Sequence, residues 1–61
     1  MKPFLDAEDD ELKVGDEVIH LKTHQTFKVY SFTEMHVICK NSDGFFKKFL
    51  PSEVELRFNR G

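Results

Sequence analysis

The feature that most constrains this chain is a series of short segments in which apolar and polar residues alternate, separated by turn-forming residues. The clearest is TFKVYSF, where Phe27 and Val29 fall on one side and Lys28 and Tyr30 on the other. Side chains of a β-strand point alternately to opposite faces, so a period of two predicts strands. Beyond the first dozen residues, no segment has the spacing of an amphipathic helix. The sequence therefore predicts an all-β protein.

Turn signals divide the chain into five expected strands. The sequence NSDG at 41–44 is the strongest of these signals, because Asp-Gly tolerates the positive φ angles of tight hairpins. Pro51 cannot donate to a strand ladder, and the Ser-Glu pair after it favours a single 3₁₀ turn before the last strand. The expected strands are 17–21, 26–32, 35–40, 45–50 and 54–58.

Five short strands joined by tight turns predict a small SH3-like barrel, a fold whose curled sheet leaves few open edges. The first strand does not alternate cleanly, so we expect a β-bulge that lets both Val18 and Leu21 point inward. The expected interior consists of Val14, Val18, Leu21, Phe27, Val29, Val37, Cys39, Leu50, Val54 and Leu56.

Length and composition indicate one small folded domain. A chain of 61 residues buries only about 60% of its unfolded surface, so its core is thin. Seven Phe among 39% hydrophobic residues are more than a disordered chain contains. Cys39 is the only cysteine, which excludes an internal disulfide and favours a reducing compartment. Since there is neither a long apolar run nor a signal-peptide core, we expect a cytoplasmic protein that does not enter the membrane.

Charge divides the chain into an acidic N-terminal extension, 1–11, and a barrel domain, 12–61. The extension carries one lysine against five Asp and Glu, whereas the rest carries eight Lys and Arg against six Asp and Glu. We expect the extension to be solvated and partly disordered, with one or two helical turns at 4–12. Two alternatives remain. The extension covers the domain electrostatically in competition with an anionic partner, or it packs on the sheet through Phe4 and Leu5.

Three stretches carry a resemblance to known proteins: KVGDEVIHLK, the central Val37-Ile38-Cys39, and SDGFFKKFLPSEVEL. Together they are similar to a family of small uncharacterised bacterial and phage-borne proteins. The resemblance covers residues 12–56 and implies an SH3-like barrel, with no settled activity. This chain has THQ at 23–25 where that family has a Gly pair. The Gly-Asp opening also resembles the KOW-type barrels of ribosomal and transcription-elongation proteins, which would imply nucleic-acid binding.

Neither a metal site nor a catalytic site is expected. His20, His24, His36 and Cys39 suffice for zinc in number, but His36 and Cys39 lie three apart on a strand and face opposite ways. Cys39 is expected in the core, where a thiol packs as an apolar group. A barrel of this size also lacks room for a water-excluding pocket. We therefore expect no catalytic residue, no cofactor and no small-molecule substrate.

The outward face of strands two to four is the expected binding surface. If Phe27 and Val29 fill the core, aromatic and lysine side chains remain outside, and exposed contiguous aromatics mark interaction sites. The register of the fourth strand is ambiguous; we place Leu50 inside, which leaves Phe49 outside. The candidate residues are Lys28, Tyr30, Phe32, His36, Ile38, Lys40, Phe45, Lys47 and Phe49.

Two kinds of partner fit an aromatic surface edged by lysine. The first is another protein, or a second copy of this chain, because aromatic anchors dominate protein interfaces. The alternative is single-stranded nucleic acid, whose bases stack on aromatic rings while lysine neutralises phosphate. The pI of about 5.8 favours the protein, since nucleic-acid-binding domains are usually strongly basic. The expected function is a non-catalytic binding module.

Overall fold

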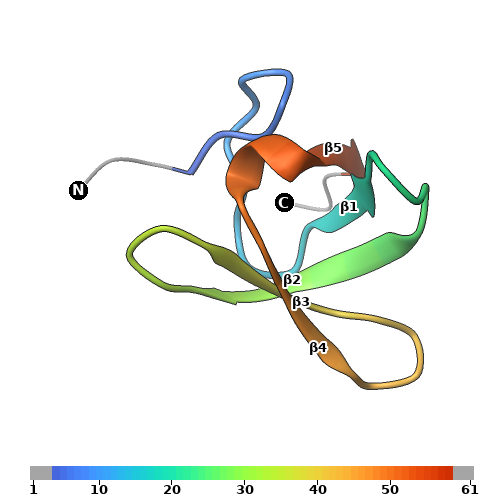
Figure 1. Cartoon of the computed structure of the whole chain (residues 1–61). Coiled ribbons are helices and arrows are strands. Elements are labelled where there is room, and N and C mark those ends of the chain that lie inside the picture. The colour runs from blue at the N-terminus through green and yellow to red at the C-terminus, as the bar shows by residue number, and fades with distance from the viewer. Residues whose placement is uncertain (1–3, 59–61) are drawn as a thin grey trace.

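The strands of the part of the chain that the structure describes belong to one antiparallel sheet, which confirms the predicted all-β class. The computed structural model describes residues 4–58. Its elements are β1 (Glu17–His20), β2 (Thr26–Phe32), β3 (Val37–Lys40), β4 (Phe46–Phe49), the 3₁₀ turn η1 (Pro51–Glu53) and β5 (Val54–Phe58). The strands lie in the order β4-β3-β2-β1-β5 (Figure 1). Within the described residues β4 and β5 do not pair with each other, so the sheet is open.

The second strand, the fifth strand and the 3₁₀ turn have the predicted bounds, whereas the other strands are shorter. In the β2–β3 connection the Thr33 hydroxyl accepts hydrogen bonds from the amides of Met35 and His36, at 3.3 and 2.9 Å. The Thr33 amide in turn donates to the His36 carbonyl at 2.8 Å. These bonds form a turn, so β3 begins at Val37. Side-chain oxygens of this kind compete with the strand ladder for backbone donors.

The Gly-Asp pair before β1 forms a turn that is fixed to β2. The Asp16 amide donates to the Lys13 carbonyl at 3.1 Å, and the Lys13 amide donates to the Asp16 carboxylate at 2.9 Å. Gly15 has a φ of +97°, which side-chain-bearing residues rarely adopt. The amide of Gly15 reaches the Val29 carbonyl, and the Val29 amide reaches the Asp16 carbonyl, both at 2.9 Å. The motif is therefore structural.

The core lies on one face of the sheet and consists mainly of predicted residues. Three expected members are wrong. Val14 is 64% exposed because it occupies the turn before β1, and Leu21 is 39% exposed because β1 ends at His20. Leu50 is 41% exposed. The buried hydrophobic residues are Leu12, Val18, Phe27, Val29, Val37, Cys39, Phe49 and Val54.

Phe49, expected at the surface, is in the core and only 7% exposed. It lies opposite Val37 of β3, and its ring contacts those of Phe27 and His20 at centroid distances of 5.0 and 4.4 Å. Leu50 falls outside β4: its amide donates to the Glu53 carboxylate at 2.7 Å and its carbonyl accepts the Glu53 amide at 2.9 Å. The 3₁₀ turn thus ends β4 one residue earlier than expected. Phe49 rather than Leu50 is therefore the core residue at the end of this strand.

A β-bulge in β2 turns Phe32 toward the core, against the predicted alternation. Val29 pairs with Cys39, but the next pair joins Ser31 to Ile38, which leaves Tyr30 as the extra residue. Past a bulge, side chains change faces relative to simple alternation. Phe32 is accordingly half-buried and packs against the core.

The N-terminal segment is anchored to the sheet by the buried carboxylate of Asp6, which is 3% exposed. This carboxylate accepts hydrogen bonds from the amides of Glu8 and Asp10, at 2.9 and 2.8 Å. It also accepts the amide of Leu56 in β5. A buried carboxylate needs such donors because it has left water. Asp6 therefore joins the acidic loop to the far edge of the sheet.

Three further contacts complete this anchoring. The Ala7 amide donates to the Val54 carbonyl of β5 at 3.0 Å, and the Leu12 amide donates to the Phe4 carbonyl at 2.8 Å. The ring of Phe4 packs on Phe32 at a centroid distance of 4.9 Å. In Figure 1 the segment (blue) lies beside η1 and β5, away from the β3–β4 hairpin.

Most side chains of residues 4–11 are exposed, as expected of a solvated extension, but hydrogen bonds hold the segment against β5 and no helical turn forms at 4–12. The segment is a loop closed by a bridge between Leu5 and Glu11. The alternative of packing through Phe4 is confirmed, while Leu5 remains 41% exposed.

The register of β4 predicts that Phe49 and Phe46 contribute unequally to stability. Phe49→Ala removes a buried ring at a cost of about 3–5 kcal/mol, comparable to the roughly 3–5 kcal/mol that a core of this size supplies. We expect this variant to be largely unfolded in buffer. Phe46→Ala should cost about 1 kcal/mol or less and keep a cooperative urea transition. Greater damage from Phe46→Ala would contradict the register.

Anchoring by Asp6 predicts a second difference, between two acids of the same loop. Asp6→Ala leaves buried amides without an acceptor and should lower the free energy of unfolding by about 1–3 kcal/mol. Asp10→Ala, at an exposed side chain, should change it by about 0.5 kcal/mol or less. Urea midpoints measure both, and hydrogen exchange of the Leu56 amide should quicken only in Asp6→Ala. Equal midpoints would show that the carboxylate does not anchor the loop.

Candidate functional site

The outward side chains of β2, β3 and β4 form two rows across the sheet. Lys28, Lys40 and Phe46 lie opposite one another in one row. Ser31, Ile38 and Lys48 form the next row, with Tyr30 at the bulge between them. We call the surface made by the exposed members of these rows the aromatic platform; it consists of Lys28, Tyr30, Lys40, Phe46 and Lys48.

Two aromatic rings form the centre of the platform. Tyr30 and Phe46 meet edge to face, with centroids 4.9 Å apart and planes inclined by 67°. Their exposed fractions are 56% and 52%, so each ring still offers about half of its surface to a partner. The Lys40 ammonium lies 5.6 Å from the Phe46 centroid, within range of a cation–π interaction. These contacts hold the rings in place before any partner binds.

The platform carries positive charge. Lys28 and Lys40 are directly opposite each other, and like charges in that position destabilise a sheet. Glu17 of β1 pairs with Lys28, and its carboxylate approaches Arg57 at 3.8 Å. The N-terminal loop, which carries five acidic residues, lies at the opposite end of the molecule from the β3–β4 hairpin (Figure 1). The acidic N-terminal loop and the basic platform are thus separated in space as well as along the chain.

Of the nine predicted site residues, the structure brings Lys28, Tyr30 and Lys40 together on the platform. Ile38 lies in the second row and is half-buried. His36 belongs to the β2–β3 turn and is half-buried.

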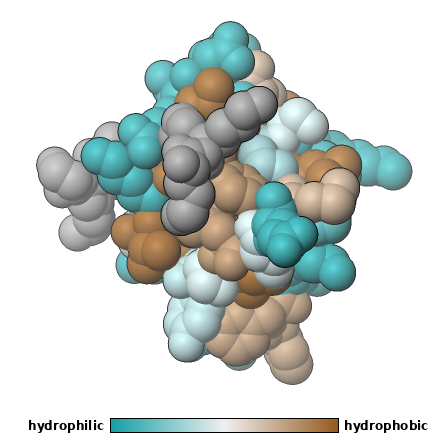
Figure 2. Space-filling model, turned by 90° about the vertical axis from the view of Figure 1, so that its left-hand side faces the viewer, coloured by the Kyte–Doolittle hydropathy of each residue, from teal (hydrophilic) through white to brown (hydrophobic). Residues whose placement is uncertain are grey.

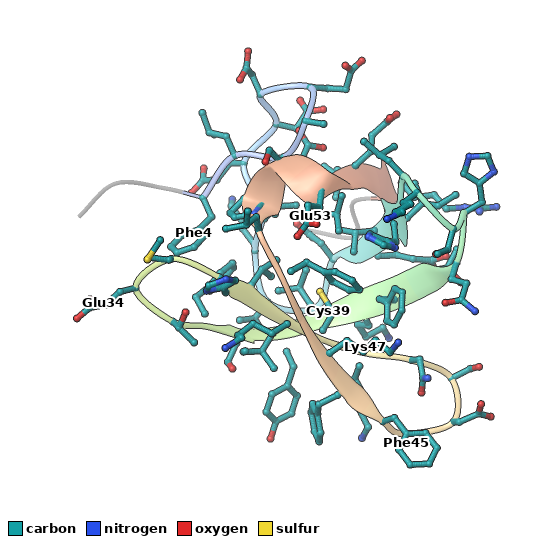
Figure 3. The ribbon with its side chains drawn as sticks, viewed as in Figure 1. Phe4, Glu34, Cys39, Phe45, Lys47 and Glu53 are labelled. Carbon is teal, nitrogen blue, oxygen red and sulfur yellow. The ribbon has the colours of Figure 1, made fainter. Side chains whose placement is uncertain are left out.

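Four predicted residues lie elsewhere. Phe32 and Phe49 face the core, for the reasons given above. Phe45 is exposed at the tip of the β3–β4 hairpin, and Lys47 pairs with buried Cys39 although its own side chain is exposed (Figure 3).

Sequence reasoning missed Phe46 and selected Lys47 rather than Lys48. Both errors follow from the register of β4, because FFKKFL places an aromatic residue and a lysine on each face in either register. The geometry of the hairpin turn at 41–44 decides the register of β4. Gly44 has a φ of +88°, and the Asn41 side chain accepts the amides of Asp43 and Phe45, both at 2.9 Å. Phe45 therefore belongs to the turn, which makes Phe46 the first strand residue.

A second surface is an open apolar groove between the N-terminal segment and the β2–β3 turn. Phe4, Phe32 and Pro51 line it, and Glu11 and Glu34 add negative charge. Figure 2 views the side of the molecule that carries this turn, and apolar side chains gather near its middle. The groove is therefore negatively charged, whereas the platform is positively charged.

The Cys39 thiol is buried and protonated, so it is not activated as a nucleophile. Its residue is fully buried, and desolvation raises the pKa of the thiol to about 11, from an ordinary value of 9.0. At neutral pH it is a protonated core group. Among residues 4–58, no three His, Cys, Asp or Glu side chains are placed to hold a metal ion. His20 instead stacks on Phe49 and shares a 3.0 Å hydrogen bond with the Thr23 hydroxyl.

Comparisons with protein families, with curated proteins and with solved structures find no match to this chain. The resemblance carried by KVGDEVIHLK and SDGFFKKFLPSEVEL stays a prediction. In the part of the chain that the structure covers, no helix is long and apolar enough to cross a membrane.

Burial of Cys39 predicts a loss of stability at alkaline pH. Between pH 9 and 11 the unfolded chain releases the thiol proton while the folded chain retains it, so unfolding becomes more favourable as pH rises. In Cys39→Ala this contribution is absent, and its free energy of unfolding should fall less over that range. Urea titrations at several pH values measure the difference. Equal slopes for both proteins would contradict the assignment.

Proposed function

We propose that this chain is a non-catalytic binding module that recognises another protein through the aromatic platform. The observation that carries the proposal is the Tyr30–Phe46 pair, whose rings are ordered against each other yet about half exposed. Aromatic side chains are enriched in the cores of protein interfaces and among the few residues that carry most of the binding energy. A partner that covers both rings gains apolar burial without having to order them.

The fold we propose is an SH3-like barrel. The antiparallel order of five strands and the 3₁₀ turn before β5 support it. So does the contact between Phe49 of β4 and His20 of β1, two strands that are not neighbours in the sheet. That contact requires a strongly curled sheet. The family resemblance over residues 12–56 belongs to the same proposal.

We propose no catalytic role and no small-molecule substrate. The single thiol is buried and protonated, and a domain of this size has little room for a pocket that excludes water. A lone buried cysteine suits a reducing compartment, so a cytoplasmic location is part of the proposal.

Single-stranded nucleic acid is the second candidate partner, favoured by the lysines that flank the two rings. The whole-chain pI of about 5.8 does not describe this surface, because much of the acidic charge lies at the other end of the molecule. The ring geometry favours a protein. Planes inclined by 67° cannot both stack on parallel successive bases, and Lys40 already lies over Phe46.

Capture from an extract of the source cells tests the proposal. Wild type, the double variant Tyr30→Ser/Phe46→Ser and the control Met35→Ser are immobilised at equal density. Met35 is 65% exposed in the β2–β3 turn, outside the platform. We expect proteins that wild type and the control retain and the double variant loses, with circular dichroism showing all three folded.

Salt distinguishes the two partners. Retention of a protein on the aromatic rings should weaken only modestly as salt rises, because apolar burial is not screened, whereas binding through phosphate contacts weakens steeply. An identical set of retained proteins for all three baits would contradict the platform. Tighter binding of oligothymidylate than of any protein would replace the first candidate by the second.

A further inference from the structure

The two edge strands of the sheet, β5 and β4, differ in whether their outer backbone groups are hydrogen-bonded. The outer edge of β5 is covered by the N-terminal segment, which supplies the Ala7 amide to the Val54 carbonyl and the Asp6 carboxylate to the Leu56 amide. The outer edge of β4 receives no hydrogen bond from any residue in 4–58. An uncovered edge presents unpaired backbone donors and acceptors to another chain.

Pairing in the β3–β4 hairpin identifies the outward groups. Directly opposite residues of antiparallel strands alternate between hydrogen-bonded and non-hydrogen-bonded pairs. The Asn41 amide donates to the Phe45 carbonyl at 2.9 Å, so that pair is hydrogen-bonded. The pairs that contain Phe46 and Lys48 are then of the other kind. The amide and carbonyl of Phe46 and Lys48 therefore point away from β3, toward the open edge.

The outward backbone groups belong to the same residues that put Phe46 and Lys48 on the platform. A strand added at this edge would place its outer side chains beside the Phe46 ring and the Lys48 ammonium. Its inner side chains would approach Lys47, which is exposed at the edge. Lys40 adds a third positive charge next to Phe46. Apolar residues alternating with carboxylates complement this arrangement.

We propose that β4 accepts an extended acidic segment of a partner protein as a sixth strand of the sheet. The proposal rests on the proposed function, since it names the partner of the platform. Backbone hydrogen bonds to Phe46 and Lys48 supply the pairing, and the lysines select carboxylates. A second copy of this chain suits the edge poorly: two β4 strands paired antiparallel about a twofold axis, with Phe46 of each opposite Lys48 of the other, would bring the two Lys47 side chains opposite each other.

The test uses the full chain, labelled with ¹⁵N, and a capped six-residue peptide of alternating valine and glutamate. Two control peptides have the same length. One alternates valine and lysine, and the other is the valine–glutamate peptide N-methylated throughout, which keeps its side chains but removes its backbone donors. We expect amide shifts at Phe46 and Lys48 with the acidic peptide alone, together with at least roughly tenfold slower hydrogen exchange of both amides at saturation.

A matched pair of variants separates the backbone from the charge. Lys48→Ala removes the ammonium and keeps the outward amide, while Lys48→Pro removes both without breaking the ladder to β3. The acidic peptide should bind Lys48→Pro roughly tenfold more weakly than Lys48→Ala, the effect of about one hydrogen bond and its neighbours. Equal affinities of Lys48→Pro and Lys48→Ala for the acidic peptide would overturn the proposal that β4 accepts an added strand. So would equally tight binding of the N-methylated and unmethylated peptides, or the absence of any amide shift at about 1 mM peptide.

The remaining outcomes distinguish this proposal from the proposed function. Shifts of Tyr30 and Phe46 with no effect of Lys48→Pro would reject the added strand and keep the platform. If the acidic peptide bound Tyr30→Ser/Phe46→Ser as tightly as wild type, but Lys48→Pro more weakly, the added strand at β4 would be kept and the aromatic platform rejected as the binding surface. Sedimentation that shows dimers lost in Lys48→Pro would assign the edge to a second copy. Tighter competition by hexathymidylate at the same amides would assign it to nucleic acid.

Discussion

Burial of Phe49 between His20 and Phe27 determines which surface this chain offers to a partner. β4 has only four residues, and its sequence would put an aromatic ring on either face. Once Phe49 occupies the interior, the alternation of the strand sends Phe46 and Lys48 outward. The same contact joins β4 to β1 across the interior, so it also supports the curl of the sheet. The core and the platform are two consequences of one register.

The N-terminal segment completes the fold at the opposite end. Its acidic residues are exposed except for Asp6, whose carboxylate occupies the position where β5 would otherwise leave an amide unpaired. This loop supplies hydrogen-bond partners to the outer edge of β5, whereas among residues 4–58 no segment does so for the outer edge of β4. The result is a molecule with one covered edge beside negative charge and one open edge beside positive charge and exposed rings. That asymmetry connects the fold to the proposed partner.

Much of the fold could be predicted from local pattern, since alternation in TFKVYSF and the proline before SEV report directly on backbone geometry. The β2 bulge could not, because Tyr30 becomes the extra residue only through pairing with β3. His24 likewise adopts a φ of 63° in a loop without glycine, which its residue type does not announce. Asp6 is one acid among five in its segment, and only its contact with Leu56, fifty residues away, sets it apart. The make-up of the exposed sheet face was therefore predicted in part: its aromatic and lysine content follows from alternation, while the placement of Phe32, Phe49 and Phe46 depends on long-range register.

Nuclear Overhauser effects between aromatic rings test the central claim most directly, because they report which phenylalanine of β4 faces the core. In ¹³C-labelled protein the account predicts contacts of the Phe49 ring with Phe27 and His20, and of the Phe46 ring with Tyr30. A Phe46 ring that instead contacts the methyl groups of Val18 or Val37 would reverse the register and remove the platform.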